Sequence, residues 1–150
     1  MGPILAAAAA HHGLPVAMLI ACAKAESDMT AAAFRNGPWP DVSVGPFQQT
    51  IEFASGFGVG TGQNTPENIA LCRAELADWK AAADVAGRNL SGCLQRAKAF
   101  DPAATLDRLC LITLSTYNSG SPKDETTAWW DTFQRHRYQD GLVFAHRLLG

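Results

Sequence analysis

The sequence has no apolar stretch long enough to cross a lipid bilayer. Its longest apolar passage runs from Leu14 to Ala23, whereas a membrane-spanning helix needs about 20 such residues. The N-terminus, MGPILAAAAAHHG, has no Lys or Arg before its alanines, so it lacks the basic region that begins a secretory signal. We therefore expect no membrane insertion, and we expect the N-terminus to fold as a helix.

Runs of like charge are also missing. Charged residues make up 17% of the 150-residue chain, and the formal net charge is −2. Nucleic acids and anionic membranes are bound through dense clusters of Lys and Arg, so neither is an expected partner. Hydrogen bonds and stacking are the expected means of holding a substrate.

Cysteine is scarce, and its spacing does not suit a metal. Cys22, Cys72, Cys93 and Cys110 form no C-x-x-C pair and have no nearby histidine at ligand spacing, so structural zinc is not expected. Cys22 and Cys110 lie in apolar helical patterns, where a free thiol behaves as a small hydrophobe. An oxidising compartment would favour a bond between Cys72 and Cys93, but free thiols are the preferred interpretation.

Helical periodicity is what the sequence does contain. With 47% hydrophobic residues, the chain suits a single domain, residues 1–150, with one sizeable core. Residues 4–12 predict a short helix that ends at Gly13 and carries two surface histidines in its last turn. Residues 16–23 repeat apolar side chains at helical spacing and predict a second helix, apolar nearly all round and buried at the centre.

Residues 35–63 lose this periodicity and are rich in Gly and Pro. Such a passage predicts loop, with room for a small β-hairpin. Its alternating glycines never complete G-x-G-x-x-G, and no strong strand precedes them, which disfavours a nucleotide site. A nucleotide cofactor is therefore not expected.

The second half of the chain predicts more helices. Thr65 and Pro66 have the properties of a helix start, and Gly87 is the expected end of that helix. Ser91 is expected to cap a shorter helix that runs to Phe100.

The Asp-Pro pair at 101–102 is the expected start of another helix, on which Tyr117 extends an apolar stripe to its rim. One or two closing helices are expected around Gly141, with Trp129 and Trp130 in the core. The predicted fold is therefore mostly α, with helices around a central buried helix and a loop-rich wall.

Glu26 stands at the end of the predicted central helix. It follows Ala23 by three residues and Cys22 by four, so it projects from the same side of the helix as these apolar groups. Burial disfavours a charged carboxylate and raises its pKa, so that the group can keep a proton near neutral pH and donate it to a leaving oxygen. The alternative is an exposed glutamate, or one paired with Lys24 or Arg35.

Three short passages occur in a recognisable order. Glu26-Ser27 ends an apolar helix, SVGPFQ follows at 43–48, and STYNSG follows at 115–120. Together they resemble the lysozyme-like lytic transglycosylases, related to goose-type lysozymes, which typically show Glu-Ser, then a Gly-Leu-Met-Gln-like loop, then an Ala-Tyr-Asn-Ala-Gly-like helix end. Pro-Phe in place of Leu-Met, and serines in place of the alanines, depart from that pattern.

The resemblance extends to the two leading helices and, more loosely, to residues 138–149, whereas residues 52–100 remain largely uncovered. It implies a lysozyme-like fold in which Glu26 is the catalytic acid and then the base, with Tyr117 near its carboxylate. It also implies substrate contacts at Ser43, Gly45, Phe47, Gln48 and Asn118. Where the substrate's own N-acetyl or hydroxyl group completes the cleavage, only the acid is indispensable, and no metal or cofactor is needed.

Each supporting residue also has a structural interpretation. Gln48 could tie down a loop, Tyr117 could send its hydroxyl to a backbone carbonyl, and Asn118 could cap a helix C-terminus. Trp39 could stack on a sugar face or pin its loop. His136, between two arginines, is expected on a solvated helix face.

The resemblance implies a peptidoglycan-cleaving lytic transglycosylase that acts on the β-1,4 bond between N-acetylmuramic acid and N-acetylglucosamine and leaves 1,6-anhydro products. One alternative is a hydrolytic lysozyme, goose-type-like or a phage endolysin, in which Asp41 or Asp28 positions water. A non-catalytic glycan-binding module is another. A structural helical domain of a phage virion or of secretion machinery would follow only if the three passages occur by chance.

The expected partners are peptidoglycan strands, cut by a monomer at the bacterial cell wall. Without a recognisable signal, the chain would act inside its cell of origin, leave by another route, or belong to a larger exported protein.

Overall fold

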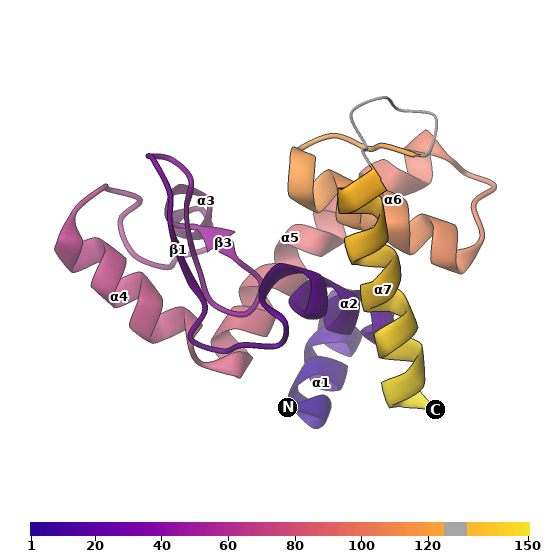
Figure 1. The fold of residues 1–150 in the computed structure, drawn as a ribbon, viewed down its shortest axis with the longest axis horizontal. Helices are drawn as coiled ribbons and strands as arrows, with labels where there is room; N and C mark the ends of the chain where they lie inside the picture. Colours follow the sequence, from indigo (N-terminus) through magenta and orange to yellow (C-terminus); the bar gives the residue numbers. More distant parts are fainter. Residues whose placement is uncertain (125–131) are drawn as a thin grey trace.

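The computed structural model describes residues 1–124 and 132–150, and helices dominate these residues (Figure 1). The described part of the chain contains seven helices: α1 Gly2–His12, α2 Val16–Ser27, α3 Ile51–Ser55, α4 Pro66–Leu76, α5 Trp79–Phe100, α6 Leu106–Ser119 and α7 Thr132–Leu149. A small sheet joins β1 Phe34–Asn36, β2 Val42–Val44 and β3 Gln49–Thr50. The predicted mostly-α class is confirmed. Trp129 and Trp130, predicted in the core, lie outside the described residues.

Helix α2 is the central helix of the core, as predicted. Every residue from Ala17 to Ala23 is buried, and α2 contacts α1, α5 and α6 as well as α7, against which it packs most extensively. The sheet, α3 and α4 lie on one side of α2, and α6 and α7 lie on the other (Figure 1). The C-terminal end of α2 therefore lies between these two parts of the molecule.

Helices α2 and α7 approach each other closely at Gly141. A Cβ atom at this position would lie only 2.6 Å from the carbonyl oxygen of Ala21. One or two closing helices were expected around Gly141, and the structure has one, because α7 is continuous through this residue. The glycine serves packing, because it lets the backbone of α7 rest against the backbone of α2.

The wall formed by residues 34–55 is more ordered than the loop and hairpin predicted for it. The strands pair antiparallel in the order β1-β2-β3, with Phe34 opposite Val44 and Ser43 opposite Thr50. Strands of two or three residues are too short to show an alternating pattern in the sequence. Gly45 follows β2 with φ +79°, and a Cβ there would lie 2.6 Å from the carbonyl oxygen of Leu76. This close approach holds the sheet against the end of α4.

The predicted helix that ends at Gly87 was wrong in its boundaries. One helix ends at Leu76, and the Asp78 side chain accepts the N–H of Ala81 as the N-cap of a new helix. This helix, α5, continues through Gly87 and Ser91, so Ser91 is not a cap. Gly87 is small for a packing reason, because a Cβ there would lie 2.3 Å from Cδ2 of His12 on α1.

The start of α6 was also predicted too early. Asp101 forms a turn in which its Oδ1 accepts the N–H of Ala103 at 3.2 Å. The helix begins only after Thr105, whose hydroxyl accepts the N–H of Arg108 at 3.4 Å. Asp101 and Thr105 are both suited to cap a helix N-terminus, and α6 begins after Thr105.

The four cysteines are buried and free, in agreement with the preferred interpretation. The Sγ atom of Cys72 lies 3.8 Å from Oδ1 of Asn68, one turn earlier on α4. Among the described residues, no helix combines the length and the hydropathy that crossing a bilayer requires.

Candidate active site

A cavity of about 490 Å³ opens at the C-terminal end of α2. Its lining includes Glu26 from α2, side chains of the three-stranded sheet and of the turn between β2 and β3, the last turn of α6, and residues of α5 and α7. The lining is predominantly polar. Each of the three passages that carry the family resemblance contributes to it.

Glu26 is held at this cavity by two residues of α7. The hydroxyl of Tyr138 donates a hydrogen bond to Oε1 of Glu26, and Nη2 of Arg137 lies 3.2 Å from the same oxygen. The Glu26 side chain is 11% exposed. The alternative pairing with Lys24 does not occur, because Lys24 pairs with Asp28.

The pKa of Glu26 is raised above its ordinary value, and burial is the largest cause. The positive charge of Arg137, the hydrogen bond from Tyr138 and the more distant charge of Arg35 all pull the pKa down. Burial outweighs these three effects. The direction agrees with the sequence prediction of a partly desolvated carboxyl that can hold a proton.

Tyr117 lies on the cavity lining but does not bond Glu26. Its hydroxyl donates to the carbonyl of Phe47 at 2.7 Å and accepts a hydrogen bond from Nε2 of Gln49. Burial raises its pKa well above the ordinary range, and the charges of Cys22 and Glu26 add to that rise. Tyr117 therefore lies near Glu26, as expected, but the hydroxyl on the carboxylate belongs to Tyr138.

Ser43, Gln48, Asn118 and Asp41 all reach the cavity lining. Gln48 adopts a left-handed backbone, with φ 47°, and its Nε2 donates to the carbonyl of Gly45 at 3.0 Å. It therefore ties the turn together and also lines the cavity. Asn118 is not the C-cap considered as its structural alternative, since α6 ends with Gly120 in that position.

Three of the predicted substrate contacts are not on the lining. Phe47 is only 1% exposed, and its ring packs edge-on against Trp79, with centroids 6.1 Å apart. Gly45 makes its close approach to the backbone of Leu76 and not to the cavity. Trp39 is 39% exposed and lies outside the lining.

The two candidates for a second acid differ in position. Asp28 follows the end of α2 in a left-handed conformation, with its side chain 78% exposed and paired with Lys24. It does not line the cavity, whereas Asp41 does. Within the described residues, Glu26 and Asp41 are the carboxylates on the lining.

The cavity also has basic side chains, and of these the sequence indicated only Arg35, as a possible partner of Glu26. Arg35, Arg96 and Arg137 lie on the lining, and Nη2 of Arg96 donates to the carbonyl of Gly120 at 2.7 Å, at the end of α6. Arg137 and Tyr138 are 111 and 112 residues from Glu26, so no local spacing links them to it. The one signal in the sequence was the loose resemblance of the segment that begins at Tyr138.

Comparison of the chain with protein-family models, curated proteins and solved structures finds no match. The chemistry of the cavity therefore follows from its own side chains. A carboxyl with a raised pKa, fixed at one oxygen and facing a polar cavity, can act as a proton donor.

Proposed function

We propose that this chain is a peptidoglycan-cleaving enzyme with a lysozyme-like fold, a lytic transglycosylase that uses Glu26 as acid and then base. One observation carries the proposal. Three passages far apart in the sequence contribute Glu26, Gln48 and Asn118 to the lining of a single cavity. Such convergence is expected if the resemblance reflects a shared site, and it has no reason to occur if the passages are chance matches.

The first step is proton transfer to the glycosidic oxygen. Protonated Glu26 donates its proton as the bond between this oxygen and C1 of N-acetylmuramic acid breaks, and the N-acetylglucosamine portion leaves as an alcohol. The carboxylate that forms is stabilised by the charge of Arg137 and by the hydroxyl of Tyr138, which both contact Oε1. Oε2 is then the oxygen that exchanges the proton.

The second step uses the carboxylate as a base. Glu26 accepts the proton of the 6-hydroxyl of N-acetylmuramic acid, and the oxygen of that hydroxyl bonds to C1 to close a 1,6-anhydro ring. The proton that Glu26 gave up is thereby restored, and no water is consumed. Arginines on the lining suit a strand whose muramic acid carries a carboxylate-bearing substituent.

Replacement of the acid tests this proposal. Glu26→Gln keeps the shape of the side chain but cannot donate the proton, so the rate of wall cleavage should fall by about 10²–10⁴-fold. Glu52→Gln is a matched control, because Glu52 is an exposed residue in the first turn of α3 and does not line the cavity. Loss of turbidity of purified cell walls is the assay, and circular dichroism checks the fold. Unreduced activity in Glu26→Gln would refute the assignment.

The position of Asp41 favours a second candidate, a hydrolytic lysozyme. Asp41 lines the cavity together with Glu26, and a second carboxylate can activate water on the opposite face of the sugar. The products separate the two functions, since hydrolysis leaves reducing N-acetylmuramic acid, one water heavier than the anhydro form. Wild-type protein that binds glycan strands but releases neither product would be a binding module instead.

A further inference from the structure

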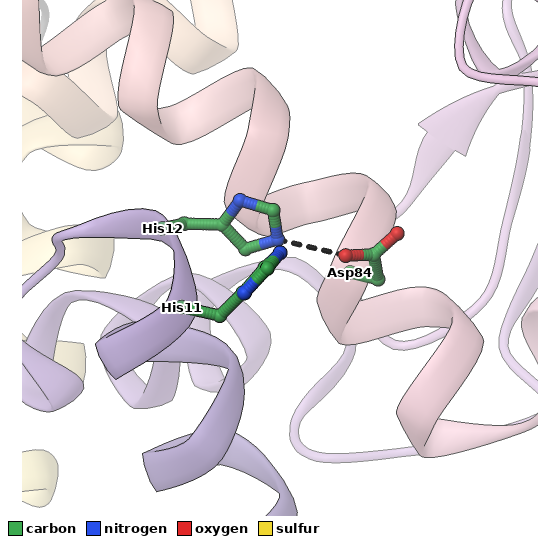
Figure 2. A group of neighbouring side chains, drawn as sticks. All are labelled: His11, His12 and Asp84. Carbon is green, nitrogen blue, oxygen red and sulfur yellow. Dashed lines mark hydrogen bonds and ion pairs between the residues drawn. The ribbon is translucent and has the colours of Figure 1, made fainter.

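Two adjacent histidines at the end of α1 meet an aspartate of α5 (Figure 2). Nε2 of His12 lies 2.8 Å from Oδ1 of Asp84, and the rings of His11 and His12 have centroids 4.7 Å apart. One donor atom from each of the three side chains lies within 4.8 Å of the others. The sequence predicted both histidines on the surface and no metal site. Asp84, however, is 72 residues from His12, so no spacing pattern reveals the cluster.

Two imidazole nitrogens and a carboxylate oxygen form a donor set that suits a borderline divalent ion. Zn²⁺ binds His and Asp in this way, whereas Mg²⁺ and Ca²⁺ prefer sites made of oxygen alone. We propose that His11, His12 and Asp84 form a Zn²⁺ site with three protein ligands and one open position. This site is separate from the proposed peptidoglycan cavity, since none of the three residues lines that cavity.

Shifts of the exposed side chains bring the three donor atoms to the spacing that the ion needs. Tetrahedral zinc with bonds of about 2.0–2.2 Å keeps its donor atoms about 3.4 Å apart. The distance between Nε2 of His12 and Oδ1 of Asp84 must therefore increase by several tenths of an ångström. The nitrogen of His11 must come to about 3.4 Å from each of these two atoms. His11 is exposed, and the Asp84 side chain is 53% exposed, so both have room to change rotamer.

His12 is the fixed member of the cluster. Its side chain is only 10% exposed, and its ring lies over Gly87, where a Cβ would come within 2.3 Å of Cδ2. The ring thus has one orientation, with Nε2 directed at Asp84 (Figure 2). One preplaced ligand with two adjustable neighbours lowers the conformational cost of binding.

The surroundings leave space for a fourth ligand. A hollow of about 450 Å³ with largely apolar walls runs along α1, and both His11 and Asp84 lie on its lining. Two of the three protein ligands therefore face open space. A catalytic-type zinc site has this composition, with three protein ligands and a water molecule in the fourth position.

Metal binding can be measured on the protein stripped of metal with EDTA and kept reduced. Titration calorimetry with ZnCl₂ should show one ion per chain, whereas MgCl₂ and CaCl₂ should give no binding. The ion links α1 to α5 in the folded state only, so zinc at about 100 times its dissociation constant should raise Tm by roughly 5–10 °C. Co²⁺ should give visible bands without a thiolate charge-transfer band, which excludes the cysteines as ligands.

Variants distinguish an ion site from a simple hydrogen bond. His11→Ala removes a proposed ligand that is outside the bond between His12 and Asp84, so it should weaken zinc by more than about 10-fold with little effect on the metal-free Tm. Asp84→Asn should weaken zinc similarly and should also lower the metal-free Tm.

Asp107→Asn is the matched control. Asp107 pairs with His146 at 3.1 Å, but this pair belongs to no group of three metal-binding side chains within the described residues. Zinc affinity should be unchanged in this variant. Absence of stoichiometric zinc binding, or equal zinc affinity in wild type, His11→Ala and Asp84→Asn, would overturn the proposal.

Discussion

The close approach of α2 and α7 at Gly141 predicts that Gly141→Ala destabilises the protein and disturbs the acid. A new Cβ would lie 2.6 Å from the carbonyl oxygen of Ala21, whereas ordinary contacts begin at 3.4 Å. The helices must therefore separate by about 0.8 Å, the difference between these two distances. Such overpacking costs about 1–3 kcal/mol. The same substitution gains about 1 kcal/mol in helix propensity, which hides part of the cost.

Gly92→Ala is the control that removes this ambiguity. Gly92 lies inside α5, and nothing stands within 4 Å of the position its Cβ would take. The variant should gain the helix propensity without the clash. The difference in free energy of unfolding between the two variants is then the clash alone, about 1–3 kcal/mol. For a chain of this size, a clash of about 2 kcal/mol corresponds to a difference in Tm of about 4–8 °C between the two variants.

Thermal unfolding followed by circular dichroism measures this difference, and wall cleavage supplies a second measurement. Tyr138 lies three residues before Gly141 on α7, so retreat of α7 draws its hydroxyl away from Glu26. Because misplacement by about 1 Å can cost 10²-fold in rate, Gly141→Ala should also lose activity per folded molecule, while Gly92→Ala should not. Equal stabilisation of Gly141→Ala and Gly92→Ala would show that α2 and α7 are not in contact at Gly141. That result would also contradict the placement of Tyr138 beside Glu26.

Three further predictions concern the acid and the product. Tyr138→Phe removes a hydrogen bond that lowers the pKa of Glu26, so the alkaline limb of the plot of kcat against pH should move to higher pH. Tyr117→Phe should leave this limb in place, because the hydroxyl of Tyr117 bonds a backbone carbonyl. Identical pH profiles for the two variants would contradict the assigned contacts. The folded pKa of Glu26 is raised, so the native state retains a proton that the unfolded chain loses near pH 4.3, and stability falls as pH rises from there through the folded pKa. The wild type should therefore lose Tm relative to Glu26→Gln as the pH rises from 4 to 7.5. A difference in Tm between the two proteins that stays constant over this range would argue against a raised pKa. Asp41→Asn should lose little of the cleavage rate and should still release mainly anhydro-muropeptides, which mass spectrometry detects. A loss of rate comparable to that of Glu26→Gln, together with reducing ends in the wild-type digest, would assign the chain to the hydrolases.

Local signals in the sequence predicted the elements that local interactions determine. Gly13 in a left-handed conformation ends α1, and the hydroxyl of Thr65 accepts the N–H of Asn68 at the start of α4. The burial of Glu26 could also be predicted, because helical spacing alone puts it on the side of Ala23 and Cys22.

The remaining features depend on contacts between distant parts of the chain. Asp78 and Thr105 prevailed over other possible caps because tertiary packing decides among local signals of similar strength. Phe47 was predicted at the substrate by its place in a passage, but its ring fills the core against Trp79. Arg137 reaches Glu26 only because α7 packs on α2, and no pattern within either segment specifies that pairing.

The pairing of α7 with α2 also has a consequence for the order in which the site is assembled. Tyr138 and Glu26 are separated by 112 residues, and contacts at such separation form late because the intervening chain must first be brought together. During synthesis α7 emerges after every other element of the cavity, so a nascent chain exposes Glu26 without its two partners. Local opening of α7 in the finished protein would reverse this last step and withdraw Arg137 and Tyr138 together. Full assembly of the acid therefore requires that α7 has packed on α2.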